Sequence, residues 1–194
     1  MKGNDILEKE VKIIGIEKDD IIGKLESNRA KKIFDGEIDM IFMDTQNAML
    51  KKGRKTLRIR KKVNSLDGST DVEVTLKIKT ADTEKESNSK LANIREEYEF
   101  HSGNFQDTVT VFEKMGYRIR YRIKKHRISY EWDDATFELD KYNKIPWIME
   151  IESENVENIR KSAGRLGFPP ERLLPWSLSE LLRHYEIEKT DRIE

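Results

Sequence analysis

The feature that most constrains this chain is the alternation of charged and apolar residues along its predicted strands. Ordinary half-buried strands alternate polar and apolar residues, because successive side chains point to opposite faces of a sheet. Here the polar member is nearly always ionic, as in Leu57-Arg58-Ile59-Arg60. One such strand would simply have a solvated charged face. The repetition of the pattern in most of the predicted strands favours an arrangement in which the charged faces meet.

Composition narrows the class of protein. Of 194 residues, 38% are charged, and the 37 basic and 37 acidic side chains give a formal net charge of zero. That balance argues against a general nucleic-acid coat, which is normally strongly basic. The absence of cysteine excludes disulfides and thiolate zinc sites. No window approaches the roughly 18 apolar residues that span a bilayer, and the N-terminus lacks the apolar stretch of a signal peptide. We therefore expect a cytoplasmic protein with no membrane partner.

The periodicity predicts strands interspersed with a few helices in one domain over residues 1–194, with a C-terminal helical segment at 155–187. The predicted strands are Leu7–Ile16, Gly36–Asp44, Thr56–Lys62, Asp71–Lys79, Ile94–Phe100, Tyr117–Glu131, Thr136–Asp140 and Trp147–Glu152. The predicted helices are Asp19–Ile33, Asn104–Met115, Asn155–Leu166 and Ser177–Tyr185. The polar stretch from Thr80 to Asn93 is predicted to be a loop.

If the helices cover the apolar faces of the strands, the ionic faces point inward. About eight antiparallel strands can close into a barrel. We therefore expect an α+β fold: a closed antiparallel eight-stranded β-barrel, forming a tunnel, with helices packed outside. Its lumen would hold the basic residues Lys12, Arg58, Arg60, Lys77, Lys79, Lys125 and Arg127 and the acidic residues Glu8, Glu10, Glu97, Glu99, Glu138, Asp140, Glu150 and Glu152.

Such a lumen indicates a particular chemistry, because buried charges are costly unless they are paired or occupied. Converging arginines and lysines suit a polyanion, since guanidinium groups match phosphate oxygens. Clustered carboxylates suit a hard divalent cation such as Mg²⁺ or Mn²⁺. Together they predict a metal-assisted phosphate site, where charge neutralisation and positioning do most of the work.

At these residues the sequence resembles the CYTH superfamily, the triphosphate tunnel metalloenzymes, which include class IV adenylyl cyclases and thiamine triphosphatases. The family motif ExExK stands here as Glu8, Glu10 and Lys12. Further matches in the family order are Phe42, Asp44, Arg58, Arg60, Thr75, Lys77, Arg95, Glu97, Glu99, Lys125, Arg127, Tyr130, Asp140, Glu150 and Glu152. The chain departs from the pattern at Phe42, where tyrosine is familiar, and at Lys144-Ile145-Pro146-Trp147, which replaces a Gly-rich turn. These departures leave the substrate open.

The resemblance implies roles for individual residues. One or two Mg²⁺ or Mn²⁺ ions would be held by Glu8, Glu10, Asp140, Glu150 and Glu152. The triphosphate would be bound by Lys12, Arg58, Arg60, Lys77, Lys125 and Arg127. Glu97 and Glu99 would support these cations or bind a second metal, and Lys79 would also have a supporting role. The catalytic set would be Glu8, Glu10, Lys12 and Glu152.

The function expected from this resemblance is hydrolysis of a small triphosphate: tripolyphosphate, thiamine triphosphate or a nucleoside triphosphate. One alternative is a class IV adenylyl cyclase that converts ATP to cyclic AMP and pyrophosphate, and another is a non-catalytic module that binds polyphosphate or nucleotide. Hydrolysis is favoured because the sequence shows no recognisable base-reading pocket. The basic run from Lys51 to Lys62 lacks neighbouring aromatic residues, so nucleic acid is not an expected partner, an RNA 5′-triphosphate end excepted. We expect a monomer or a homodimer.

Overall fold

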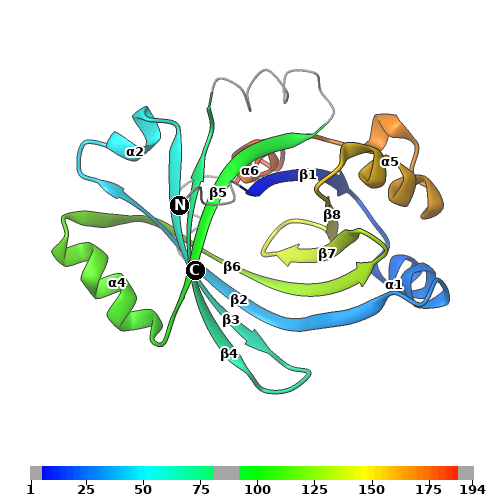
Figure 1. Ribbon diagram of the computed structural model, residues 1–194, viewed down its shortest axis with the longest axis horizontal. Coiled ribbons are helices and arrows are strands. Elements are labelled where there is room, and N and C mark those ends of the chain that lie inside the picture. The colour runs from blue at the N-terminus through cyan, green and yellow to red at the C-terminus, as the bar shows by residue number, and fades with distance from the viewer. Residues whose placement is uncertain (1–5, 81–91, 188–194) are drawn as a thin grey trace.

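The computed structural model describes residues 6–80 and 92–187, with side chains from residue 9 onward. Within these residues, antiparallel strands close into a barrel in the order β1-β5-β4-β3-β2-β6-β7-β8 (Figure 1). The strands are β1 Ile6–Ile14, β2 Lys31–Thr45, β3 Lys55–Asn64, β4 Thr70–Ile78, β5 Asn93–Ser102, β6 Tyr117–Trp132, β7 Ala135–Tyr142 and β8 Ile148–Glu152. The predicted closed eight-stranded barrel is confirmed.

The helices lie in the connections between strands. They are α1 Lys18–Ser27, α2 Met49–Lys52, α4 Phe105–Lys114, α5 Val156–Arg165 and α6 Leu178–His184, with a 3₁₀ turn η1 at Pro170–Arg172. Local chemistry starts three of them, because the side chains of Asn104, Asn155 and Ser177 accept hydrogen bonds from backbone N–H groups of the first turn. Ser177 and Glu180 form a reciprocal capping box. None of the helices in the described residues has the length and apolar character that a membrane-crossing helix needs.

Two predicted boundaries were wrong. The helix expected at Asp19–Ile33 ends at Ser27, and Lys31 already belongs to β2. Arg29 turns the chain with a φ of 62°, and Lys31 then pairs with Glu131 of β6, so strand pairing overrides the helical pattern. The loop expected from Thr80 to Asn93 lies mostly outside the described residues, but Asn93 is the first residue of β5.

Apolar residues on the outer face of the barrel pack against helices on two sides. α1 and α5 cover β1, β7 and β8 through a cluster that includes Val11, Leu25, Leu139 and Ile159. α4 covers β2, β3 and β4, where Val109 belongs to the same cluster as Ile59. Figure 1 shows these helices on opposite sides of the barrel. Burial of these outer faces leaves the ionic faces directed inward, as the alternation predicts.

Helices do not cover every apolar position. Tyr98 and Phe100 of β5 are 45% and 53% exposed, although helices were expected to cover the apolar faces of the strands. Conversely, the inner wall is not ionic throughout. Met40 and Phe42 of β2 line the lumen and pack in one cluster with Leu181 and Leu182 of α6. α6 therefore lies against the apolar part of the inner wall, at the border of the charged part.

Candidate functional site

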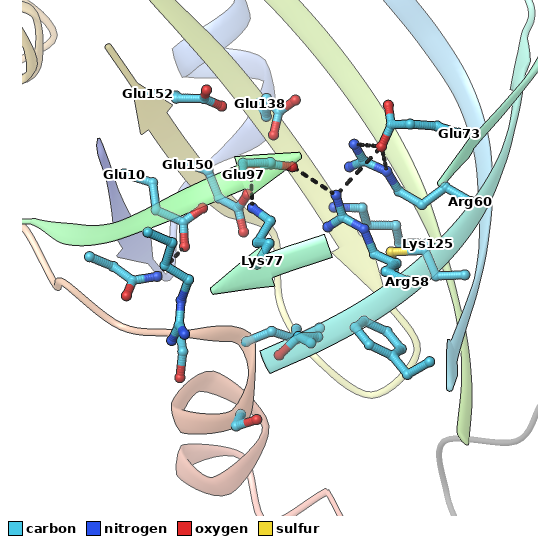
Figure 2. Close-up of a pocket in the computed structure, with 18 of the residues that line it drawn as sticks. Glu10, Arg58, Arg60, Glu73, Lys77, Glu97, Lys125, Glu138, Glu150 and Glu152 are labelled. Carbon is cyan, nitrogen blue, oxygen red and sulfur yellow. Dashed lines mark hydrogen bonds and ion pairs between the residues drawn. The ribbon is translucent and has the colours of Figure 1, made fainter. Parts of the chain in front are cut away.

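The lumen holds a cavity of about 640 Å³ lined by charged side chains from seven of the eight strands (Figure 2). Most of the predicted lumen residues line it: Glu10, Lys12, Arg58, Arg60, Lys77, Glu97, Glu99, Lys125, Arg127, Glu138, Glu150 and Glu152. Residues that the sequence did not single out as site residues also line it, among them Glu73, Asn93, Arg95, Tyr121 and Tyr142. The structure thus brings together groups that lie more than a hundred residues apart in the chain.

Lys12 lies at one end of this cavity, between two carboxylates. β1 runs between β5 and β8, and its register places Glu10 opposite Glu152 and Lys12 opposite Glu150. The Lys12 Nζ is 2.9 Å from a Glu10 oxygen and 3.1 Å from a Glu150 oxygen. Burial alone would lower the pKa of Lys12, but these two carboxylates outweigh it and raise that pKa above its ordinary value. Lys12 is therefore a fixed positive charge.

Arg127 and Lys125 of β6 both donate hydrogen bonds to Asp140, which lies outside the cavity lining. Arg127 donates through Nε and Nη2 to the two Asp140 oxygens, each at 2.6 Å, and Lys125 donates to the same carboxylate at 2.6 Å. Arg127 also reaches Glu150 at 3.2 Å and contacts Glu138. Asp140 is fully buried and does not line the cavity. From this position Asp140 can orient Arg127 and Lys125, but it does not face the space that a ligand would occupy.

Lys125 differs from Lys12 in its electrostatics. Burial, followed by repulsion from Arg127, lowers the pKa of Lys125 to about 8. Its Nζ also lies 3.3 Å from the hydroxyl of Tyr142. Two lysines in one cavity are thus tuned in opposite directions, and perturbed groups of this kind concentrate at functional sites.

The middle of the cavity is bridged by ion pairs between β3, β4 and β5. Lys77 Nζ lies 3.1 Å from Glu97. Arg58 donates to the Thr75 hydroxyl at 3.3 Å and lies 3.7 Å from Glu97. Arg58, Lys77 and their shared partner Glu97 all line the cavity.

Glu73 of β4 anchors the other end. Arg60 and Lys62 donate directly to its carboxylate, the Thr75 hydroxyl donates to it at 2.9 Å, and Arg58 lies 3.5 Å away. Burial would raise the pKa of Glu73, but these cations lower it far below the ordinary range of a carboxyl. Sequence reasoning missed Glu73, although its period-two relation to Thr75 and Lys77 places all three on one face.

Besides Asp140, two predicted site residues are not placed among those that line the cavity. The side chain of Glu8 lies outside the described residues, although its backbone pairs with Arg95 in β1. Lys79 follows the end of β4 and does not line the cavity.

The carboxylates are of the donor type that Mg²⁺ and Mn²⁺ prefer. Glu10, Glu150 and Glu152 line the same end of the cavity and fit such an ion chemically. Among the described residues, however, no three carboxylate or histidine side chains are close enough together to hold a metal. The cause is visible in the contacts, because Lys12 stands between Glu10 and Glu150. Metal binding would require these carboxylates to exchange an internal cation for the ion.

An apolar wall borders the charged cavity. The rings of Phe42 and Tyr121 are stacked, with centroids 4.5 Å apart and an interplanar angle of 21°. Met40 and Leu178, the first residue of α6, extend this wall. The cavity therefore has one flat apolar side beside its rows of charge.

Comparison with known proteins places this geometry in a family. A similar structure is PH1012 of Pyrococcus horikoshii, with 26% sequence identity, a TM-score of 0.69, and a match covering 90% of this chain and 98% of that one. A putative adenylate cyclase of Vibrio parahaemolyticus shares the fold at 16% identity, with a TM-score of 0.76 and coverage of 91% and 98%. So does a putative adenylyl cyclase of Hippeastrum with a dominant triphosphatase activity, at 15% identity, a TM-score of 0.58 and coverage of 92% and 95%. Among curated proteins none matches.

The family model of the CYTH domain matches residues 7–163, which include every strand of the barrel except the first residue of β1. This match extends over far more than half of the chain. The chain therefore belongs to the CYTH domain family.

Proposed function

We propose that this protein is a divalent-metal-dependent triphosphatase that binds a small triphosphate in the barrel lumen. The observation that carries the proposal is the enclosed row of cations that line one cavity: Lys12, Arg58, Arg60, Lys77, Lys125 and Arg127. Figure 2 shows Lys77, Arg58 and Arg60 in succession from the Glu10 side of the view, with Lys125 on the Arg58 side. A row of fixed cations matches the spaced negative charges of a phosphate chain better than it matches a single anion. The Hippeastrum protein with a dominant triphosphatase activity shares the fold of this chain, and that likeness extends to the fold alone.

The carboxylates at the Lys12 end are the proposed ligands of one or two Mg²⁺ or Mn²⁺ ions: Glu8, Glu10, Glu150 and Glu152. A bound divalent ion would supply neutralisation of the phosphate oxygens. Asp140 was expected in this set, but both of its oxygens are engaged by Arg127 and Lys125. We assign it to positioning these two cations. Glu97 and Glu99 support the cations on β3 and β4.

The residues of this chain would act mainly by positioning. Arg127 is held in plane by two hydrogen bonds to Asp140, so its remaining N–H groups have a fixed direction. Lys12, which keeps its charge, would offset the charge that develops on phosphate oxygens. Binding of the anion would draw Lys12 away from Glu10 and Glu150, which would free these carboxylates for the metal.

A second candidate function is that of an adenylyl cyclase. The stacked Phe42–Tyr121 pair favours it, because a flat apolar wall beside the phosphate row can accept a planar base. The same wall would also accept the organic part of a thiamine or nucleoside triphosphate in a hydrolase. The wall therefore supports an organic triphosphate without deciding the reaction.

Product analysis separates these functions. The purified protein is supplied with Mg²⁺ or Mn²⁺ and, in turn, tripolyphosphate, ATP and thiamine triphosphate, and phosphate, pyrophosphate and cyclic AMP are measured. We expect release of phosphate from at least one substrate. Equimolar cyclic AMP and pyrophosphate from ATP would establish the cyclase instead. Tight binding without turnover of any substrate would reduce the protein to a binding module.

Glu10→Gln tests the proposed carboxylate site. It removes one charge but keeps the size of the side chain, so we expect turnover to fall by about a hundredfold or more, as when one preorganised electrostatic group is lost. The matched control is Glu157→Gln on α5, where the side chain is 77% exposed, and it should retain full turnover. Thermal unfolding confirms that both variants are folded. Full activity in Glu10→Gln would remove Glu10 from the site.

A further inference from the structure

The Glu73 end of the cavity contains an internal anion in the place where a row of phosphates would continue. We propose that Glu73 limits the length of the phosphate chain that the lumen accepts, because its carboxylate occupies the last cations of the row. This inference rests on the proposed binding of a triphosphate and deepens it. Figure 2 shows Glu73 against Arg60, on the opposite side of the view from Glu10.

The first observation is the depth of the pairing at Glu73. Its side chain is 1% exposed, and it takes direct contacts from Arg60 and Lys62 together with a hydrogen bond from Thr75. A carboxylate with this many charge-assisted contacts and so little exposure to solvent is strongly held. We therefore expect the Glu73 carboxylate to keep its position when a ligand binds, unlike a side chain that can move into solvent.

The second observation is that the ion pair with Glu73 is closer for Arg60 than for Arg58. Arg60 is in close contact with Glu73, whereas Arg58 lies 3.5 Å from Glu73 and 3.7 Å from Glu97. The Glu97 side chain is 14% exposed, against 1% for Glu73, so we expect a ligand to displace Glu97 more easily than Glu73. Arg58 can thus transfer its contacts to a phosphate, whereas Arg60 must share its guanidinium with Glu73.

These two observations fix the end of the ligand. In this proposal, a triphosphate that begins at Lys12 and passes Lys77 would end at Arg58, and Arg60 would contact its last phosphate. One further phosphate would have to displace Glu73 from Arg60, and this buried carboxylate would lose one of the cations that pair with it. Glu99 stands beside Glu73, and burial together with the charge of Glu73 already raises the pKa of Glu99, so this end of the cavity resists more negative charge.

The experiment compares two inorganic chains on the intact protein by titration calorimetry in the presence of a chelator, so that neither chain is hydrolysed during the measurement. Tripolyphosphate and tetrapolyphosphate are titrated into the unaltered protein and into Glu73→Gln. In the variant the affinity for tetrapolyphosphate relative to tripolyphosphate should rise by about tenfold, the gain from one charge-assisted contact. Asp39→Asn makes the same change of charge on the outer face, where Asp39 pairs with Arg122, and should leave the ratio unchanged.

Each outcome decides a different point. An unchanged ratio in Glu73→Gln, with tight binding of tripolyphosphate, would overturn the role of Glu73 and leave the proposed function intact. Absence of binding of either chain to the unaltered protein would overturn the proposed function and this inference with it.

A second variant keeps the inference open to test if Glu73→Gln does not fold. Lys62 is partly exposed at the end of the row and pairs with Glu73, so Lys62→Gln should leave the affinity for tripolyphosphate unchanged. A loss of about tenfold would show that the phosphate chain reaches Lys62, and that result would contradict a limit at Glu73.

Discussion

Lys125 and Lys12 show that burial acts differently on two lysines of the same cavity. Both are nearly inaccessible to solvent, but Lys12 lies between Glu10 and Glu150, whereas Lys125 lies beside Arg127. Burial and that arginine lower the pKa of Lys125 to about 8. Lys125 is therefore charged at neutral pH and loses its proton in mildly alkaline solution, where Lys12 stays charged.

Binding of tripolyphosphate should consequently weaken as the pH rises through about 8. The sign follows from the charge, because the protonated lysine attracts phosphate and the neutral lysine does not, so binding favours uptake of a proton. Lys125→Arg keeps the charge and should flatten this loss of affinity. The measurement is Kd between about pH 6.5 and 9.5, a range that extends on both sides of the shifted pKa of Lys125. If the variant and the unaltered protein lose affinity in parallel, the titration belongs to another group.

The same residue scale shows what the sequence could predict. Alternation alone placed Lys12, Glu10 and Glu150 on inward faces, and in the structure Lys12 forms ion pairs with both glutamates. Alternation says nothing of depth, so Glu10, which lines the cavity, and Asp140, which stands behind it, looked equivalent. Depth depends on strand tilt and on which neighbour is long enough to cover a carboxylate, and these are properties of the closed barrel.

At the scale of elements, β2 was the hardest strand to predict. It pairs along its length with β3 and β6, with irregular register near Phe34 and near Met43. Apart from Asp39, its segment Ile38-Asp39-Met40-Ile41-Phe42-Met43 is apolar on both faces, because one face meets α4 and the other meets α6. A sequence pattern without alternation cannot show which face a helix covers, so the contact of α6 with the inner wall required the structure.

Gly36 tests how closely β2 and β3 approach each other. A Cβ at this position would lie 2.0 Å from the carbonyl oxygen of Val63, a backbone atom that can move only with its strand. Gly36→Ala should therefore lower the free energy of unfolding by about 1–3 kcal/mol, the usual range for overpacking. Because Gly36 is also the register partner of Arg127, binding of tripolyphosphate should weaken as well.

The matched control is Gly23→Ala in α1, where an added Cβ meets nothing within 4 Å. Helix propensity predicts an unchanged or increased stability there, by up to about 1 kcal/mol. Urea denaturation of the two variants gives the comparison. Equal stability of both variants would mean that the contact between Gly36 and Val63 relaxes without cost.

At the scale of the whole molecule, the zero net charge acquires a structural meaning. Basic and acidic side chains in the lumen pair with one another, as Lys77 does with Glu97 and Arg127 with Asp140. Buried pairs add little net stability, but an uncompensated buried charge would cost several kcal/mol. These charges are thus paired within the protein, and a triphosphate with its metal would replace internal partners of both signs.

Chelation and ligand addition should therefore affect stability differently. Because the carboxylates of Glu10 and Glu150 are already balanced by Lys12, a chelator should abolish turnover while leaving Tm within about 2 °C of its original value, a shift below 1 kcal/mol for a chain of this size. Tripolyphosphate with Mg²⁺ at about a hundred times Kd should stabilise the fold by about 2.7 kcal/mol and raise Tm by roughly 5–10 °C. Thermal unfolding followed by circular dichroism measures both effects. A large fall in Tm on chelation would show that a metal, and not the pairing of lumen charges, holds the strands of the barrel together.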